Sequence, residues 1–189
     1  MILAITGHRP SRSTFPATDR ALWHLENLAR KHLKLIEPDR VLIGMALGWD
    51  TACGLVCQQL GIPFVAVLPF VGQENRWEAY DQIRFRNLLR NADEILCLHS
   101  VPVVSHVEAA KLYHQRNRYL VDHADRVLAL LNPKLQTGGT YATVSYAIAK
   151  GLPVTNTWAE MLLHPVRGPA HKPRKWKPWW SMNAARGAQ

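Results

Sequence analysis

"RVLIGMALGWDTACGLVCQQLGIPFVAVLP", residues 40–69, contains two apolar runs separated by a segment long enough for a helix. The runs RVLIG (40–44) and FVAVLP (64–69) are rich in β-branched and aliphatic residues, and neither alternates with polar ones. Between them, DTACGLVCQQL predicts a helix that ends at Gly61. Strands without polar alternation are buried on both faces, and a helix between two of them is the usual connection of parallel strands. The stretch therefore predicts a βαβ unit.

The same alternation of strands and helices extends in both directions from this unit. Apolar runs predict further strands at 2–6, 94–98, 126–131 and 152–157. Helical spacing of apolar residues, with Thr18 as one N-cap and a Ser105–Glu108 capping box as another, predicts further helices at 19–36, 77–91, 105–123 and 139–150. We therefore expect an α/β fold, a doubly wound, mostly parallel Rossmann-like sheet with helices on both faces.

Composition divides the chain into a body and a tail. The 189 residues are 48% hydrophobic and 20% charged, which is typical of a globular protein with one α/β domain. Residues 165–189 hold six of the 23 Lys and Arg and no acid, so 17 basic and 14 acidic residues remain in 1–164, a net charge of +3 out of +9. We expect a Rossmann-like domain over 1–164 and a basic, Trp- and Pro-rich tail over 165–189.

The sequence gives no sign of a membrane span, a signal peptide or a metal site. No apolar run approaches the roughly 20 residues that cross a bilayer, and the apolar start of the chain is short and lacks a preceding basic segment. Cys53, Cys57 and Cys97 lack the paired spacing of zinc ligands, and the histidines lack metal-binding spacing. We expect a cytoplasmic protein with buried free cysteines, no metal and no cofactor.

Four loops that follow the expected strands carry residues suited to an anionic ligand. In open α/β sheets, ligands bind outside the carboxyl ends of the strands. Glycine lets the backbone approach a ligand closely, and a helix N-terminus directs free N–H groups at an anion. Each of these turns, taken singly, can also be interpreted as an ordinary glycine-containing βα turn without a ligand. None matches a dinucleotide fingerprint or a Walker A loop. The loops are 6–10, 44–51, 69–77 and 137–140.

Taken in order over about residues 2–156, these motifs resemble the YpsA-like branch of the SLOG superfamily. SLOG groups the DNA-processing protein DprA with the cytokinin-activating LOG enzymes. The resemblance implies a Rossmann-like fold that binds a nucleotide or nucleotide-derived ligand, such as an ADP-ribose-type molecule, as a sensor or sequestering protein. The motifs that carry it are Thr6-Gly7-His8-Arg9-Pro10, Gly44-Met45-Ala46-Leu47-Gly48-Trp49-Asp50, Pro69-Phe70 with Gln73 and Trp77, Arg116-Asn117-Arg118-Tyr119, and Gly138-Gly139-Thr140.

The loops and the resemblance together predict the residues that bind the ligand. Arg9 and Arg116 would pair with phosphates, and Trp49 or Trp77 would stack a base. Gln73 and Asn117 would bind polar edges of the ligand. The predicted ligand-binding residues are Gly7, His8, Arg9, Gly44, Leu47, Gly48, Asp50, Gln73, Trp77, Arg116, Asn117, Gly138, Gly139 and Thr140.

A LOG-like N-glycoside hydrolase is one alternative function. Arg116 matches the arginine of the LOG signature, but Gly138-Gly139-Thr140 is followed by residues 141–145, which contain no carboxylate in place of the LOG glutamate. Cleavage through an oxocarbenium-like state needs a nearby carboxylate, which leaves Asp50 and Glu74 as weak catalytic candidates. Asp50 has a second interpretation as a residue that caps a helix.

DprA-like binding of single-stranded nucleic acid is the other alternative. The tail interleaves cations with Trp176, Trp179 and Trp180, a composition that can stack on bases. It also describes a basic disordered terminus or a membrane-surface patch. The body's net charge of +3 argues against an extended binding groove. We therefore expect only weak nucleic-acid contact through the tail. Separately, we expect the protein to be a homo-oligomer.

Overall fold

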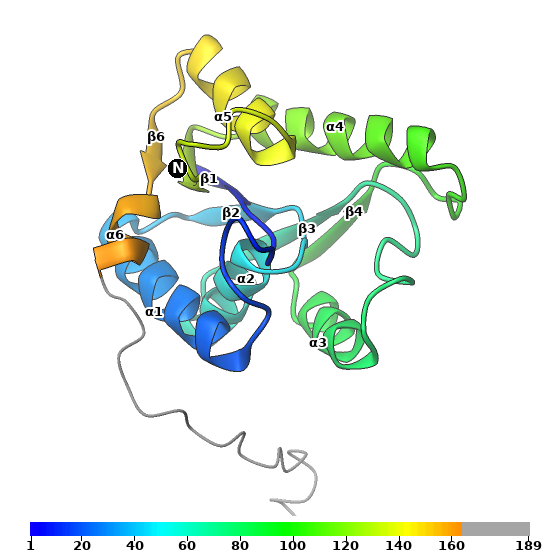
Figure 1. The fold of residues 1–189 in the computed structure, drawn as a ribbon, viewed down its shortest axis with the longest axis horizontal. Coiled ribbons are helices and arrows are strands. Elements are labelled where there is room, and N and C mark those ends of the chain that lie inside the picture. Colours follow the sequence, from blue (N-terminus) through cyan, green and yellow to red (C-terminus); the bar gives the residue numbers. More distant parts are fainter. Residues whose placement is uncertain (164–189) are drawn as a thin grey trace, which may run out of the picture.

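The computed structural model describes residues 1–163, which form a six-stranded sheet covered by helices on both faces (Figure 1). All paired strands are parallel, in the order β4-β3-β2-β1-β5-β6. The doubly wound Rossmann-like fold predicted from the sequence is therefore confirmed. The strands are β1 (Ile2–Gly7), β2 (Arg40–Ile43), β3 (Phe64–Leu68), β4 (Glu94–Cys97), β5 (Arg126–Leu130) and β6 (Val154–Asn156).

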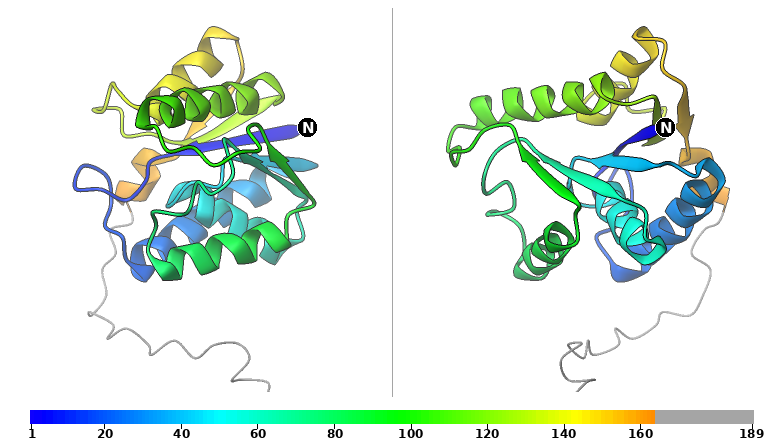
Figure 2. Two further views of the ribbon diagram at one scale, coloured as in Figure 1. Left: turned by 90° about the vertical axis from the view of Figure 1, so that its right-hand side faces the viewer. Right: turned by 180° about the vertical axis from the view of Figure 1, so that it is seen from behind.

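The helices lie in two layers, one on each face of the sheet. Figures 1 and 2 show α4 and α5 on one face, and α1, α2, α3 and α6 on the other. Each layer closes its own apolar core, one around Leu25, Trp49 and Phe64 and the other around Leu120 and Val127. The helices are α1 (Asp19–Ile36), α2 (Trp49–Leu60), α3 (Ala79–Arg90), α4 (His106–Asp122), α5 (Gly139–Ala149) and α6 (Trp158–Leu163).

The direction of winding reverses between β1 and β5. The chain moves outward from β1 through β2 and β3 to β4, and α4 then returns it to β5 on the other side of β1. The two central strands pair Thr6 with Ala129 and Gly7 with Leu130 at their carboxyl ends. Such a switch point opens a crevice at the carboxyl edge of the sheet, where ligands of this fold class bind.

Local signals in the sequence fix most of the boundaries of the helices. The Thr18 hydroxyl accepts a hydrogen bond from the Ala21 N–H at 3.2 Å, and the Ser105 hydroxyl accepts one from the Glu108 N–H at 3.4 Å. Gly61 follows α2 in the left-handed conformation at φ 67°. The capping signals therefore place the ends of α1, α2 and α4 within two residues of the expected positions.

The short helix α6 was not predicted. It packs on α1, where the carboxylate of Glu160 lies 2.9 Å from Nε2 of His32 and also binds Lys31. The predicted division into a domain over 1–164 and a tail over 165–189 stays a prediction, because the tail lies outside the described residues.

No helix within residues 1–163 is long and apolar enough to cross a membrane. Cys53 and Cys57 are buried free thiols, and burial raises the pKa of Cys57 to about 12 and that of Cys53 well above its usual range. The same part of the chain contains no cluster of three or more residues that could hold a metal ion.

Candidate functional site

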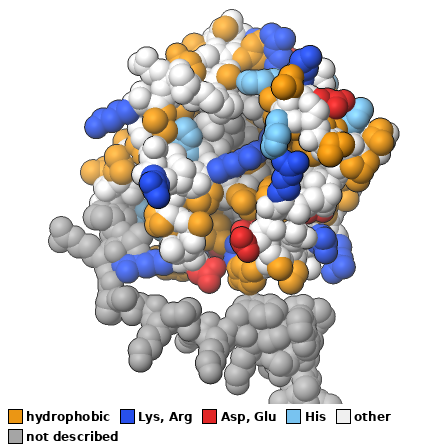
Figure 3. Space-filling view, turned by 45° about the vertical axis from the view of Figure 1, so that its right-hand side comes forward, with side chains coloured by type: hydrophobic (Ala, Val, Ile, Leu, Met, Phe, Trp, Pro, Cys, Tyr) orange, Lys and Arg blue, Asp and Glu red, His pale blue; other side chains and the backbone are white. Residues whose placement is uncertain are grey.

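A cavity of about 360 Å³ opens at the carboxyl edge of the sheet, at the switch point between β1 and β5. Its walls come from the end of β1, the loop before α2, the middle of α4 and the N-terminus of α5. Figure 3 shows a hollow on this side of the molecule with Lys or Arg and His side chains around it. The lining residues are Ile5, Thr6, Gly7, Arg9, Ala46, Asp50, Ala110, Tyr113, His114, Arg116, Asn117, Leu120, Gly139 and Thr140.

The floor of the cavity is the loop between β2 and α2, which holds a strained residue. Met45 has φ 57°, a left-handed conformation that is unusual for a non-glycine residue. Gln73 fixes it by donating a hydrogen bond from Nε2 to the Met45 carbonyl at 3.0 Å. The Thr51 hydroxyl donates to the Ala46 carbonyl at 2.9 Å, and the Ala46 N–H donates to the Asp50 carboxylate at 3.1 Å. Three side chains therefore hold this loop in one shape.

Arg116 and Asp50 form a buried ion pair beneath the cavity. Nη1 of Arg116 lies 3.7 Å from Oδ2 of Asp50, and each side chain is only 5% exposed. The guanidinium lies against the backbone of Gly44, where a Cβ atom would lie 1.3 Å from Nη1. Within residues 1–163, Nε and Nη1 of Arg116 are buried without a hydrogen-bond partner. A buried donor without a partner is costly, so these two nitrogens are available to a water or a ligand in the cavity.

Burial dominates the electrostatics of this pair. It raises the pKa of Asp50, while the opposite charge of Arg116 and the Ala46 N–H act in the other direction. Burial also lowers the pKa of Arg116, which Asp50 partly opposes. Burying these two charges therefore costs stability through desolvation. Charged groups perturbed in this way are common at functional sites.

In the described part of the chain, the N-terminus of α5 has neither a side-chain cap nor an acidic residue nearby in the helix. Its N-cap is Gly138, at φ 88°, and across residues 1–163 no side chain caps it and its first turn carries no acid. Gly139 and Thr140, the first two residues of α5, line the cavity. Helix α2 also lacks a side-chain cap at Gly48, but Asp50 in its first turn offsets its positive end. The positive end of α5 is therefore less offset than that of α2.

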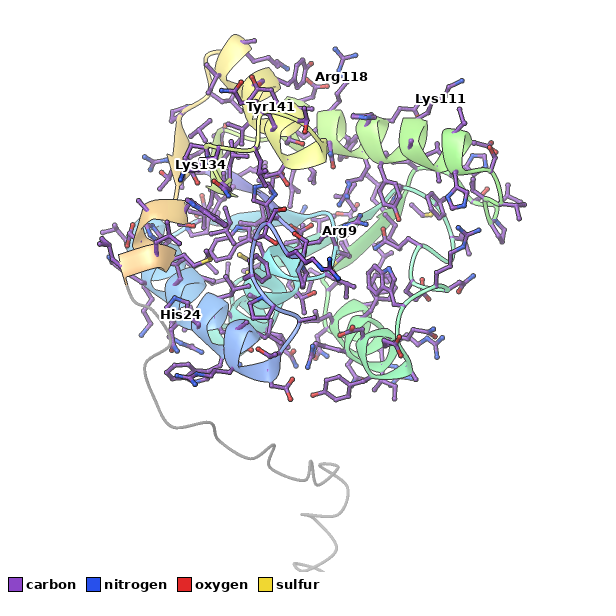
Figure 4. All side chains as sticks on the ribbon, in the orientation of Figure 1. Arg9, His24, Lys111, Arg118, Lys134 and Tyr141 are labelled. Atoms are coloured by element: carbon purple, nitrogen blue, oxygen red, sulfur yellow. The ribbon has the colours of Figure 1, made fainter. Side chains whose placement is uncertain are left out.

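Tyr113 is a cavity residue that the sequence reasoning missed. The Arg9 guanidinium carbon lies over its ring, 5.1 Å from the centroid, and that of Arg116 lies 5.9 Å away. Phe70 packs against Tyr113 edge-to-face, with ring centroids 5.4 Å apart. Figure 4 shows Arg9 projecting from the loop after β1, below α4. Helical spacing could have identified Tyr113 as a cavity residue, because Tyr113, Arg116 and Asn117 share one face of α4.

The structure brings half of the predicted ligand-binding residues together at the cavity. Gly44, Gly48 and Gly138 shape its loops without lining it. Asp50 does not cap free N–H groups of α2 but accepts from Ala46, ahead of the helix. The predicted residues that line the cavity are Gly7, Arg9, Asp50, Arg116, Asn117, Gly139 and Thr140.

The remaining predicted residues lie elsewhere and have other contacts. His8 packs edge-to-face on Trp158, and its burial lowers its pKa. Gln73 holds the floor loop, as described above, and Leu47 and Glu74 do not line the cavity.

Neither tryptophan proposed for base stacking lines the cavity. Trp49 is fully buried beneath Gly7, and Trp77 packs edge-to-face on Phe85 at 5.3 Å.

Known structures share this fold. The DNA processing protein DprA of Streptococcus pneumoniae superposes with a TM-score of 0.54 at 18% identity, covering 80% of this chain and 48% of that protein, so this chain spans about half its length. A DprA of Helicobacter pylori, whose structure concerns its single-stranded DNA binding mode, gives a TM-score of 0.54 at 17% identity, covering 89% of this chain and 74% of that one.

Relatives in sequence are closer. The UPF0398 protein of Bacillus licheniformis is 29% identical over 149 residues, which cover 74% of this chain and 79% of the relative. The model of the YspA SLOG family, YpsA, matches residues 3–151. That match includes every strand but β6 and every wall of the cavity. The chain therefore belongs to the YspA (YpsA) SLOG family.

Proposed function

We propose that this protein binds a nucleotide or nucleotide-derived ligand of the ADP-ribose type in the cavity, as a sensor or sequestering protein. The observation that carries the proposal is Arg116, a buried guanidinium at the cavity with two nitrogens that lack a hydrogen-bond partner in the described chain. A phosphate or ribose oxygen would satisfy these donors, because charge-assisted hydrogen bonds to an anion suit an arginine fork.

Three further features support an anionic ligand of this size. The lining carries two arginines, Arg9 and Arg116, against one carboxylate, Asp50, among the described residues. The uncapped N-terminus of α5 adds partial positive charge at Gly139 and Thr140. The volume of about 360 Å³ falls within the roughly 300–1,000 Å³ typical of small-molecule pockets.

Thermal unfolding in the presence of nucleotides tests the proposal. We expect AMP or ADP-ribose to raise the unfolding temperature, since a ligand at ~100 times its dissociation constant adds about 2.7 kcal/mol of stability. Arg9→Ala should reduce the affinity about tenfold or more, because a hydrogen bond to a charged group contributes about 1.5–3 kcal/mol. Arg9 is exposed, so its loss should leave the fold intact.

Arg12→Ala is the matched control for Arg9→Ala. Arg12 is exposed in the same loop and carries the same charge, but it does not line the cavity. It should bind the nucleotide like the original protein. If no nucleotide of the panel shifts the unfolding temperature, the proposed function is wrong.

Hydrolysis of the N-glycosidic bond is a second candidate function, and Asp50 is the residue that favours it. Of the two carboxylates considered from sequence, Asp50 lines the cavity and Glu74 does not. Asp50 is, however, engaged by Arg116 and the Ala46 N–H, which favours binding over turnover. Chromatography of the nucleotide after long incubation separates the two: free base indicates hydrolysis, and intact ligand indicates a binding protein.

Binding of single-stranded nucleic acid is the remaining alternative, and a salt series tests it. We expect the full chain to bind oligonucleotides weakly and a 1–164 chain to bind less, because two thirds of the excess charge is in 165–189. Filter binding at several salt concentrations measures both. Equal binding by the shorter chain would favour a DprA-like interface on the folded body.

A cytoplasmic location and a homo-oligomeric state stay predictions.

A further inference from the structure

Among the described residues, Tyr113 is the Phe, Tyr or Trp side chain that lines the cavity. It is half-buried on the inner face of α4, one turn before Asn117. The edge of Phe70, itself buried, holds the ring from one side, with an angle of 69° between the ring planes. The ring is therefore positioned by packing.

Arg9 covers this ring in the free protein. Its guanidinium carbon is 5.1 Å from the ring centroid, a cation–π distance, yet the arginine is exposed and belongs to a loop. A cation–π contact at an exposed site stabilises by only about two- to fivefold in an equilibrium constant, so Arg9 can leave the ring readily. Stacking of a base on an aromatic side chain contributes roughly 5- to 150-fold.

The cavity thus has two unlike ends along α4. At one end Asn117 faces the N-terminus of α5, where an ideal Cβ on Gly139 would lie 3.4 Å from the Asn117 amide nitrogen. At the other end is the Tyr113 ring, four residues or about one helical turn away. The buried guanidinium of Arg116 lies between these residues in sequence and also faces the Tyr113 ring. An anionic group and a flat ring joined by a spacer would fill both ends.

We propose that Tyr113 is the residue on which the aromatic ring of the ligand stacks, and that Arg9 covers Tyr113 until the ligand displaces it. The displaced Arg9 then pairs with the phosphate of the ligand. This inference rests on the proposed function and assigns the base end of the same site, since an anion alone would need the arginines and α5 but not Tyr113.

Isothermal titration with AMP and with ribose 5-phosphate tests this assignment. Tyr113→Leu keeps apolar packing against Phe70 but removes the aromatic face, so it should weaken AMP binding by about tenfold or more. It should not weaken the binding of ribose 5-phosphate, because that probe lacks a base and Arg9 no longer has to leave the ring to reach the phosphate. Tyr113→Phe keeps the face and should bind AMP like the original protein.

Tyr141→Leu is the matched control, because Tyr141 is 38% exposed on the first turn of α5 and does not line the cavity. It should leave the AMP affinity unchanged. Suppose that AMP binds the unsubstituted protein. If Tyr113→Leu then weakens the binding of AMP and of ribose 5-phosphate equally, or weakens the binding of neither, the stacking assignment is wrong while the proposed function stands. If no nucleotide binds the original protein, both are wrong.

Discussion

Arg116→Met is expected to lower the free energy of unfolding by about 3–5 kcal/mol at pH 7, because it leaves the buried Asp50 without its ionic partner. Methionine fills a similar volume, so the loss reflects the uncompensated carboxylate more than a cavity. The Ala46 N–H would still donate to Asp50, but one hydrogen bond does not replace the opposite charge. Urea unfolding followed by circular dichroism measures the change.

The double variant Asp50→Asn/Arg116→Met separates the ion pair from other causes. Asparagine keeps a carbonyl oxygen that can accept from the Ala46 N–H, and the double variant contains no buried charge. We expect it to be more stable than Arg116→Met, so that the two single effects do not add. Strict additivity would mean that Asp50 and Arg116 do not interact energetically.

The pH dependence of the stability of Arg116→Met is an independent test of whether the unpaired Asp50 carboxylate causes the loss. Burial already raises the pKa of Asp50 above its ordinary 3.8, and loss of Arg116 removes an influence that lowers it. A carboxyl whose pKa is higher in the folded than in the unfolded state binds its proton more tightly when folded. The stability of the folded state then falls as pH rises from about 4 through the raised pKa. The deficit of Arg116→Met relative to the double variant should therefore shrink toward pH 4.

The sheet could be predicted because its central strands β1, β2, β3 and β5 are apolar and mostly buried, and the helices beside them are marked by caps. Val41 and Ile43 are fully buried, as a strand covered by helices on both sides requires. Helix α6 could not be predicted in the same way. It has only six residues, and its position depends on Glu160 meeting His32, 128 residues earlier in the chain.

The glycine loops located the site, but the side-chain arrangement inside it depends on contacts between distant residues. Nothing local in the sequence joins Asp50 to Arg116, since α4 must first cross the sheet for them to meet. Trp49 reads as a stacking residue in a loop motif. It is instead buried because Gly7 has no Cβ, which would lie 2.4 Å from the indole. Tyr113 could have been predicted as a site residue, because its helical spacing from Arg116 and Asn117 places the three residues on one face of a helix.

Gly44→Ala is expected to abolish the nucleotide-dependent rise in unfolding temperature. A Cβ on Gly44 would lie 1.3 Å from Nη1 and 2.3 Å from Cζ of Arg116, so the guanidinium must leave its place at the cavity. That movement removes the charge-assisted contacts proposed for the phosphate and also separates Arg116 from Asp50. Leaving the buried Asp50 without its ionic partner costs about 3–5 kcal/mol, as in Arg116→Met, and we expect Gly44→Ala to lose stability of that size as well.

Gly54→Ala is the control for the substitution itself, because Gly54 is also buried but a Cβ there would make only ordinary contacts, at 3.4 Å from Leu88. It should keep the nucleotide response, and alanine's higher helix propensity, by about 1 kcal/mol, favours α2. A second comparison isolates the steric cause. In an Arg116→Ala background the atoms that clash with Gly44→Ala are gone, so adding Gly44→Ala should change the unfolding free energy far less than it does alone. If Gly44→Ala destabilised both backgrounds equally, its effect would come from the loop backbone rather than from the guanidinium that lies on it.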